Sequence, residues 1–208
     1  MLISTQVLAF LFTAVLLTAT PGPDNLMVLS VGMSRGKRAG IAFGLGCALG
    51  CLSHTTLAVV GVSALVAASP MAFFVLKITG GVYLVVLGVQ ALRHAGGTTM
   101  ATDQAGEVSL QRLFAKGLLA NAINPKVVLF FLSFLPQFVD TSREDVAWQL
   151  GLLGVLFTAQ AAVLFVLLGY FAGSVGGWLS RKPSVGLWLD RLAACVFIAL
   201  GIRIMVVY

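Results

Sequence analysis

The chain has 208 residues, of which 59% are hydrophobic and only 10% are charged. So few polar side chains cannot cover a soluble protein of this length, and the composition predicts a membrane protein. A net charge of +6 would favour nucleic acid as a partner of a soluble protein. Here the basic residues cluster in short segments between apolar stretches, where they set membrane topology, and nucleic acid is excluded as a partner.

Six apolar stretches are long enough to cross a bilayer, since a transmembrane helix needs about 20 apolar residues. They predict an all-α membrane protein with one transmembrane domain, residues 1–208. A polar linker over residues 94–111 divides three spans from three, which makes the two halves, 1–93 and 112–208, an inverted 3+3 repeat. The expected spans are residues 4–33, 39–68, 70–92, 112–138, 147–172 and 188–207.

Basic residues near the ends of the spans predict the orientation, because Lys and Arg stay on the cytoplasmic side. The connections after the first, third and fifth spans are rich in them, whereas the opposite side has only Arg143. We therefore expect both termini outside and the linker in the cytoplasm. The basic residues on the predicted cytoplasmic side are Arg35, Lys37, Arg38, Arg93, Arg112, Lys116, Arg181, Lys182 and Arg191.

The first span is interrupted by Pro21, Gly22, Pro23, Asp24 and Asn25. The prolines remove two backbone donors and disfavour helix before them, so the chain must unwind there. A carboxylate near the middle of the bilayer costs about 2.5–3.5 kcal/mol on insertion scales. Exposed backbone is tolerated at that depth only inside protein or along a water-filled cavity. The sequence predicts a cavity at Asp24; the alternative is a kink in which Asp24 only caps the restarting helix.

The second span has small residues at alternating four- and three-residue spacing, which places them on one helix face and favours close packing of helices. His54 is the exception on this face, because a buried imidazole needs a polar partner or water. The three cysteines of the chain are predicted to be small packing residues. The face consists of Gly40, Gly44, Cys47, Cys51, His54, Ala58 and Gly61.

The fourth span is also interrupted, by Asn121, Asn124, Pro125 and Lys126. A helix that restarts after Pro125 turns free N–H groups and its positive dipole end toward the gap, which suits an anion. Lys126 is about ten residues past Lys116, some 15 Å along a helix, and so lies deep in the membrane. It either lines a cavity or forms a structural ion pair with Asp24.

Broken spans in the two halves of a membrane protein indicate a binding site near the midplane. One carboxylate, one ammonium and several amides suit a zwitterion, with Asp24 receiving an α-ammonium and Lys126 and the amides receiving an α-carboxylate. Gln160, in the fifth span, is expected to form a hydrogen bond between helices or to line the cavity. The candidates for proton coupling are Asp24 and His54.

These motifs resemble those of the lysine-exporter and homoserine/threonine-resistance (LysE/RhtB-type) amino-acid exporters. The resemblance lies in Thr20–Asn25, the basic loop Ser34–Arg38, Asn124–Lys126 and Phe134–Phe138, and extends over the whole chain. It implies a bacterial inner-membrane exporter of amino acids driven by the proton gradient. With Asp24 as the one candidate binding carboxylate, neutral substrates such as threonine, homoserine, its lactone or leucine are favoured over basic ones.

Other functions would have to use the same residues. An electron carrier would need paired thiols, but neither break contains a cysteine. A channel or ion transporter remains an alternative, although no second carboxylate or Cys/His cluster accompanies Asp24 in the sequence to hold a metal. We expect neither enzymatic activity nor a cofactor. The sequence does not decide whether the protein forms a homo-oligomer, because small-residue faces pack helices within or between chains.

Overall fold

The computed structural model describes residues 4–19, 22–93, 109–140, 143, 145–181 and 183–206. Regular structure within these ranges is entirely helical. The elements are α1 (Ser4–Ala19), α2 (Pro23–Arg35), α3 (Lys37–Leu57), the π-helix η1 (Ala58–Val62), α4 (Ser63–Ala68), α5 (Pro70–Arg93), α6 (Leu110–Ala122), α7 (Pro125–Phe134), the 3-10 helix η2 (Leu135–Phe138), α8 (Val146–Tyr170), α9 (Ala172–Arg181) and α10 (Pro183–Val206). Most of the predicted linker lies outside the described residues.

Among the described residues, two helices are long and apolar enough to cross a membrane, Lys37–Val62 and Val146–Tyr170. The bent pair Gln6–Ala19 and Pro23–Arg35, with 55° between its helices, makes a third if it is one span. Phe74–Gln90 and Ala194–Arg203 are shorter apolar helices. The all-helical class is thus confirmed, while the six-span arrangement stays a prediction.

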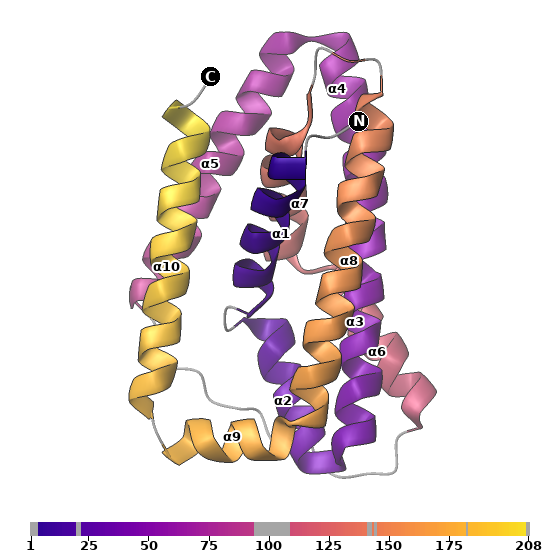
Figure 1. The fold of residues 1–208 in the computed structure, drawn as a ribbon, viewed down its shortest axis with the longest axis vertical. Coiled ribbons are helices and arrows are strands. Elements are labelled where there is room, and N and C mark those ends of the chain that lie inside the picture. Colours follow the sequence, from indigo (N-terminus) through magenta and orange to yellow (C-terminus); the bar gives the residue numbers. More distant parts are fainter. Residues whose placement is uncertain are drawn as a thin grey trace.

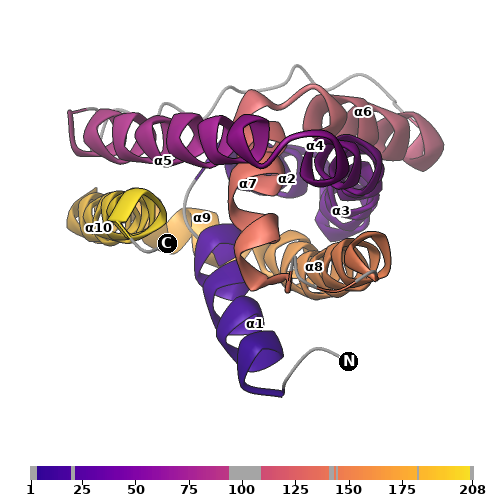
Figure 2. The same cartoon turned by 90° about the horizontal axis from the view of Figure 1, so that it is seen from above.

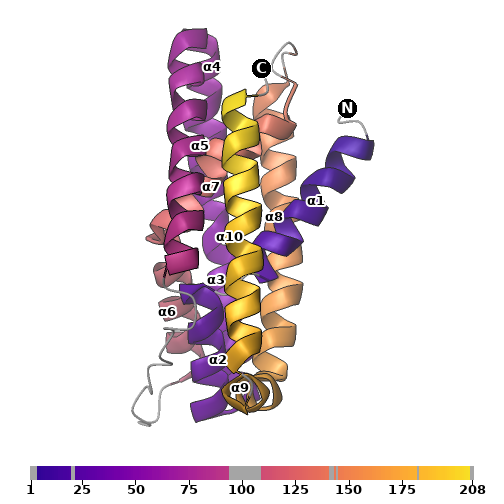
Figure 3. The ribbon, with the colours of Figure 1, turned by 90° about the vertical axis from the view of Figure 1, so that its left-hand side faces the viewer.

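The helices form an elongated bundle in which the long helices lie side by side (Figure 1). α5 lies along α10, and α3 packs against both α6 and α8 (Figures 1 and 2). α1 leans away from the bundle, whereas α2 below it lies inside (Figure 3). α9, which the sequence did not predict, runs across the end of the bundle where α2 meets α3 (Figure 1).

α3 uses small residues on two faces rather than on one. Gly40 meets the backbone of Gly169 on α8, as the predicted face requires. On a second face, Gly50 lies against Asn121 of α6. Gly61, the last residue of the predicted face, does not take part in this close packing. No atom of the described residues would lie within 4 Å of a side chain added there. The small faces of α3 therefore pack helices within the chain and bring the backbones of α3 and α6 close together.

Six phenylalanines fill the bundle between the breaks and the end where η2 lies. Phe10 of α1 lies 5.4 Å from Phe138 and 6.4 Å from Phe134, measured between ring centroids. The cluster continues through α7 to α8, where Phe131 is 4.9 Å from Phe157. We call Phe10, Phe130, Phe131, Phe134, Phe138 and Phe157 the phenylalanine cluster.

Candidate functional site

The first break lies between α1 and α2, at the place the sequence predicts. Gly22 has extended backbone, with φ −159° and ψ 176°, and Pro23 starts α2, where its missing N–H costs no helical hydrogen bond. The Nδ2 of Asn25 donates to the carbonyl of Thr18 at 2.8 Å, which ties the new helix to the end of the old one. Pro21 lies outside the described residues. The break places Asp24 in the first turn of α2, where the helix dipole favours a carboxylate.

The second break lies between α6 and α7. Pro125 starts α7 and has no N–H, so the carbonyl of Asn121 loses the donor that a continuous helix would supply. Two other donors replace it: the backbone N–H of Asn124 at 2.9 Å and the Nε2 of His54 at 2.9 Å. His54 therefore has the polar partner that its buried position requires.

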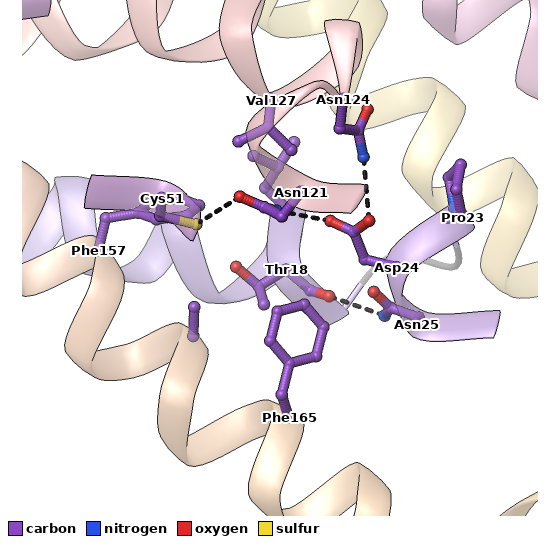
Figure 4. Close-up of a pocket in the computed structure, with 13 residues that line it drawn as sticks. Thr18, Pro23, Asp24, Asn25, Cys51, Asn121, Asn124, Val127, Phe157 and Phe165 are labelled. Atoms are coloured by element: carbon purple, nitrogen blue, oxygen red, sulfur yellow. Dashed lines mark hydrogen bonds between the residues drawn. The ribbon is translucent and has the colours of Figure 1, made fainter. Parts of the chain in front are cut away.

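The two breaks meet at Asp24 (Figure 4). Asn121 donates from Nδ2 to one carboxylate oxygen at 2.7 Å, and Asn124 donates to the other at 3.2 Å. Only 9% of Asp24 is exposed. Within the described side chains its hydrogen-bond partners are neutral amides, which orient the carboxylate without cancelling its charge. The Oδ1 of Asn121 accepts in turn from the Cys51 thiol at 3.5 Å.

A pocket of about 470 Å³ lies against this carboxylate. Its polar wall comes from the breaks, and its apolar wall comes mainly from α8. A second hollow, of about 640 Å³, shares Thr18, Asn25 and Phe165 with it and extends along α8 to Val175 of α9. The pocket is lined by Leu17, Thr18, Gly22, Pro23, Asp24, Asn25, Cys51, Asn121, Asn124, Val127, Phe157, Ala161 and Phe165.

Two helices begin at the pocket, α2 at Pro23 and α7 at Pro125. Each directs the positive end of its dipole there, and the first turn of α2 already carries Asp24. No acidic residue occupies the first turn of α7. The arrangement offers a carboxylate for a cation and, close to it, a helix N-terminus for an anion.

The structure brings most of the predicted site residues to one place. Gln160 and His54 are not among the pocket-lining residues. Each forms a hydrogen bond to a residue that does line the pocket, Gln160 to Thr18 and His54 to Asn121. The side chains of Pro125 and Lys126 are not described, so both predicted roles of Lys126 stay predictions. Sequence reasoning missed Thr18 and Cys51 as lining residues, and it did not identify which residues form the apolar wall. Proximity to Pro21 was a signal for Thr18, but nothing in the sequence marked the wall.

The residues that could take part in metal or thiol chemistry are the cysteines, histidines and acidic residues of the described part of the chain. No group of three His, Cys, Asp or Glu side chains there is close enough to hold a metal ion. Cys47 and Cys51 are free and buried, and Cys195 is free and exposed.

Comparison with known proteins places the chain in a family. The family model described as LysE type translocator matches residues 15–207. The chain belongs to this family. The resemblance seen in the proline motifs is confirmed, and the family is one of translocators.

Named relatives of this LysE-type chain include a homoserine/homoserine lactone efflux protein of Salmonella typhimurium, 31% identical, with 93% of the chain and 92% of the relative covered. A leucine efflux protein of Salmonella choleraesuis is 29% identical, with 94% and 92% covered. An "uncharacterized membrane protein" of Vibrio cholerae is 34% identical, with 93% of each covered. No solved structure matches the chain.

Proposed function

We propose that this protein exports small neutral amino acids or close derivatives, such as threonine, homoserine, its lactone or leucine, across the bacterial inner membrane in exchange for protons. The observation that carries the proposal is Asp24: a buried carboxylate held by two neutral amides at the wall of a pocket. A buried charge needs compensation, and a proton or a ligand ammonium would supply it in turn. Family membership and the efflux named for two relatives support the same conclusion.

The pocket fits a zwitterion with a small side chain. The α-ammonium would lie at Asp24, and the α-carboxylate would lie toward the start of α7 and Lys126. Phe157, Ala161 and Phe165 provide an apolar wall for the side chain. A basic amino acid would need a second acid, and Asp24 is the one carboxylate among the lining residues. Neutral substrates are therefore favoured over basic ones.

The packing supports six spans in an inverted 3+3 repeat. α3 pairs with α8, α5 pairs with α10, and the broken pair α1–α2 meets the broken pair α6–α7 at Asp24, so each predicted span contacts its counterpart. The α2–α3 junction, with Lys37 stacked 4.7 Å from the Tyr170 ring, lies at the same end as α9. We assign this basic end to the cytoplasm and both termini to the outside. The hollow beside α9 then opens the site toward the cytoplasm.

Uptake of labelled amino acids into everted membrane vesicles tests the proposal, because such vesicles turn export into accumulation. We expect saturable uptake of threonine, homoserine or leucine that an uncoupler abolishes, and little uptake of lysine. Asp24→Asn should abolish it, whereas the control Asp145→Asn, at an exposed carboxylate paired with Arg143, should not. Uptake that is selective for lysine would refute the proposal that the substrates are neutral amino acids. Unchanged uptake by Asp24→Asn would refute the site.

A further inference from the structure

Two polar side chains behind the pocket each support one of the breaks. His54, on α3, is 1% exposed and places its Nε2 2.9 Å from the carbonyl of Asn121. Gln160, on α8, donates from Nε2 to the hydroxyl of Thr18 at 2.9 Å. α3 belongs to the first half of the chain and supports the break of the second half. α8 belongs to the second half and supports the break of the first.

The breaks themselves correspond. Each restarting helix begins with proline followed by a charged residue, Pro23–Asp24 in α2 and Pro125–Lys126 in α7. In each break a side-chain amide or imidazole reaches a carbonyl of the preceding helix: Asn25 reaches Thr18, and His54 reaches Asn121. In both halves a side chain donates to a carbonyl at the break, although Asn25 comes from the restarting helix itself and His54 comes from α3.

The supporting helices correspond as well. α3 and α8 pack in opposite directions, since Gly40 meets Gly169 near one end and Thr55 meets Gly154 near the other. α5 and α10 also run antiparallel, with Gly88 against Ile198. A two-fold axis that exchanges the halves would exchange α3 with α8. His54 follows Pro23 by 31 residues and Gln160 follows Pro125 by 35, so the two side chains differ by about one helical turn along the corresponding helices.

The hydrogen bonds of His54 favour a fixed donor over a proton carrier. A carbonyl accepts at Nε2, so Nε2 carries a proton, and Nδ1 is buried without a partner in the described part of the chain. A second proton on Nδ1 would leave a buried N–H unsatisfied, which is costly. Among the described residues, His54 bonds the backbone carbonyl of Asn121, and no hydrogen bond joins it to Asp24.

We infer that His54 and Gln160 are equivalent positioning residues, each reaching from one half of an inverted repeat to hold the broken helix of the other half in its substrate-binding geometry. The inference rests on the proposed function of the pocket. It assigns His54 a role other than the proton relay that its residue type predicts. The two hydrogen bonds that join the halves, from His54 to Asn121 and from Gln160 to Thr18, both end on pocket-lining residues. Substrate binding and the packing of the two halves are therefore linked.

Transport kinetics in everted vesicles distinguish positioning from proton transfer. In His54→Gln, the amide Nε2 lies as many bonds from Cα as the imidazole Nε2, and it donates but does not titrate. We expect His54→Gln to keep its KM within about twofold and its pH profile unchanged. His54→Ala and Gln160→Ala should raise KM about tenfold for the loss of one hydrogen bond, with a smaller change in kcat.

Matched controls remove a hydroxyl whose hydrogen bond, in the described part of the chain, stays within its own helix. Thr55→Val on α3 and Thr158→Val on α8 lose bonds to Cys51 and Gly154 carbonyls, and should leave KM unchanged. If His54→Gln is as inactive as His54→Ala, or loses the pH dependence, His54 is a proton relay and the inference fails. It also fails if KM stays at the wild-type value in both alanine variants.

A second readout needs no substrate. With Cys47→Ala and Cys195→Ser in place, Cys51 is the single thiol, it lines the pocket, and it donates to Asn121. N-ethylmaleimide should alkylate it about tenfold faster in His54→Ala and Gln160→Ala than in the threonine controls. Equal rates in all four would overturn the inference. If wild-type protein accumulates no amino acid while these rates differ as expected, the proposed function fails and the positioning role stands.

Discussion

Replacing Gly50 by alanine tests whether close packing of α3 on α6 sets the position of Asn121. The added Cβ would lie 2.8 Å from both Cβ and Oδ1 of Asn121 and 2.9 Å from the carbonyl of Leu118. Ordinary contacts start at 3.4 Å, so α6 must shift by about 0.6 Å or more. That shift would stretch the 2.7 Å hydrogen bond from Asn121 to Asp24 beyond the normal range.

The cost of such overpacking is about 1–3 kcal/mol. For a chain of this length, 1 kcal/mol corresponds to about 2–4 °C, so we expect the melting temperature in detergent to fall by roughly 2–12 °C. Transport in everted vesicles should fall with it. Gly61→Ala is the control, because no described atom lies within 4 Å of the added Cβ. A Gly50→Ala protein with wild-type melting and transport would refute the packing argument.

Three further predictions concern other parts of the chain. Gly36 has φ 87° and ψ 166°, a backbone region that only glycine occupies readily, so Gly36→Ala and Gly36→Asn should both destabilise the α2–α3 turn by about 1–3 kcal/mol, which thermal unfolding would measure. A variant with Cys47→Ala and Cys195→Ser, which keeps the pocket-lining Cys51, should keep its transport rate; loss of transport with no loss of folded protein would revive the thiol carrier. Hydrogen bonds from Arg143 and Gln149 lower the pKa of Asp145 below its ordinary 3.8. The ionised Asp145 carboxylate should therefore stabilise the folded protein fully above pH 3.8, and this stabilisation should be lost as the pH falls through the lowered pKa. The melting temperatures of wild type and Asp145→Asn should then converge in acid. A difference in melting temperature that stays constant with pH would contradict this.

Sequence reasoning located the breaks because proline and glycine act locally. Pro125 alone implies a carbonyl of Asn121 without its helical donor. The donor that replaces it, His54, is 67 residues away in sequence and could not be assigned from spacing. α9 was missed because three glycines in ten residues disfavour helix and its apolar residues are too few for a span. Phe165 was missed for a related reason, since a phenylalanine in an apolar span looks the same whether it faces lipid, core or pocket.

The phenylalanine cluster has a consequence for leakage. If the protein exchanges substrate for protons as proposed, the six packed rings would hinder water and protons from reaching the site from the η2 end. α1 joins the cluster through Phe10, which makes ring contacts with Phe134 and Phe138. Separating these two ring pairs costs about 1–3 kcal/mol in addition to the packing that the buried Phe10 would lose. In the proposed exchange of substrate for protons, these rings would close the site on the η2 side, and opening that side would separate α1 from them.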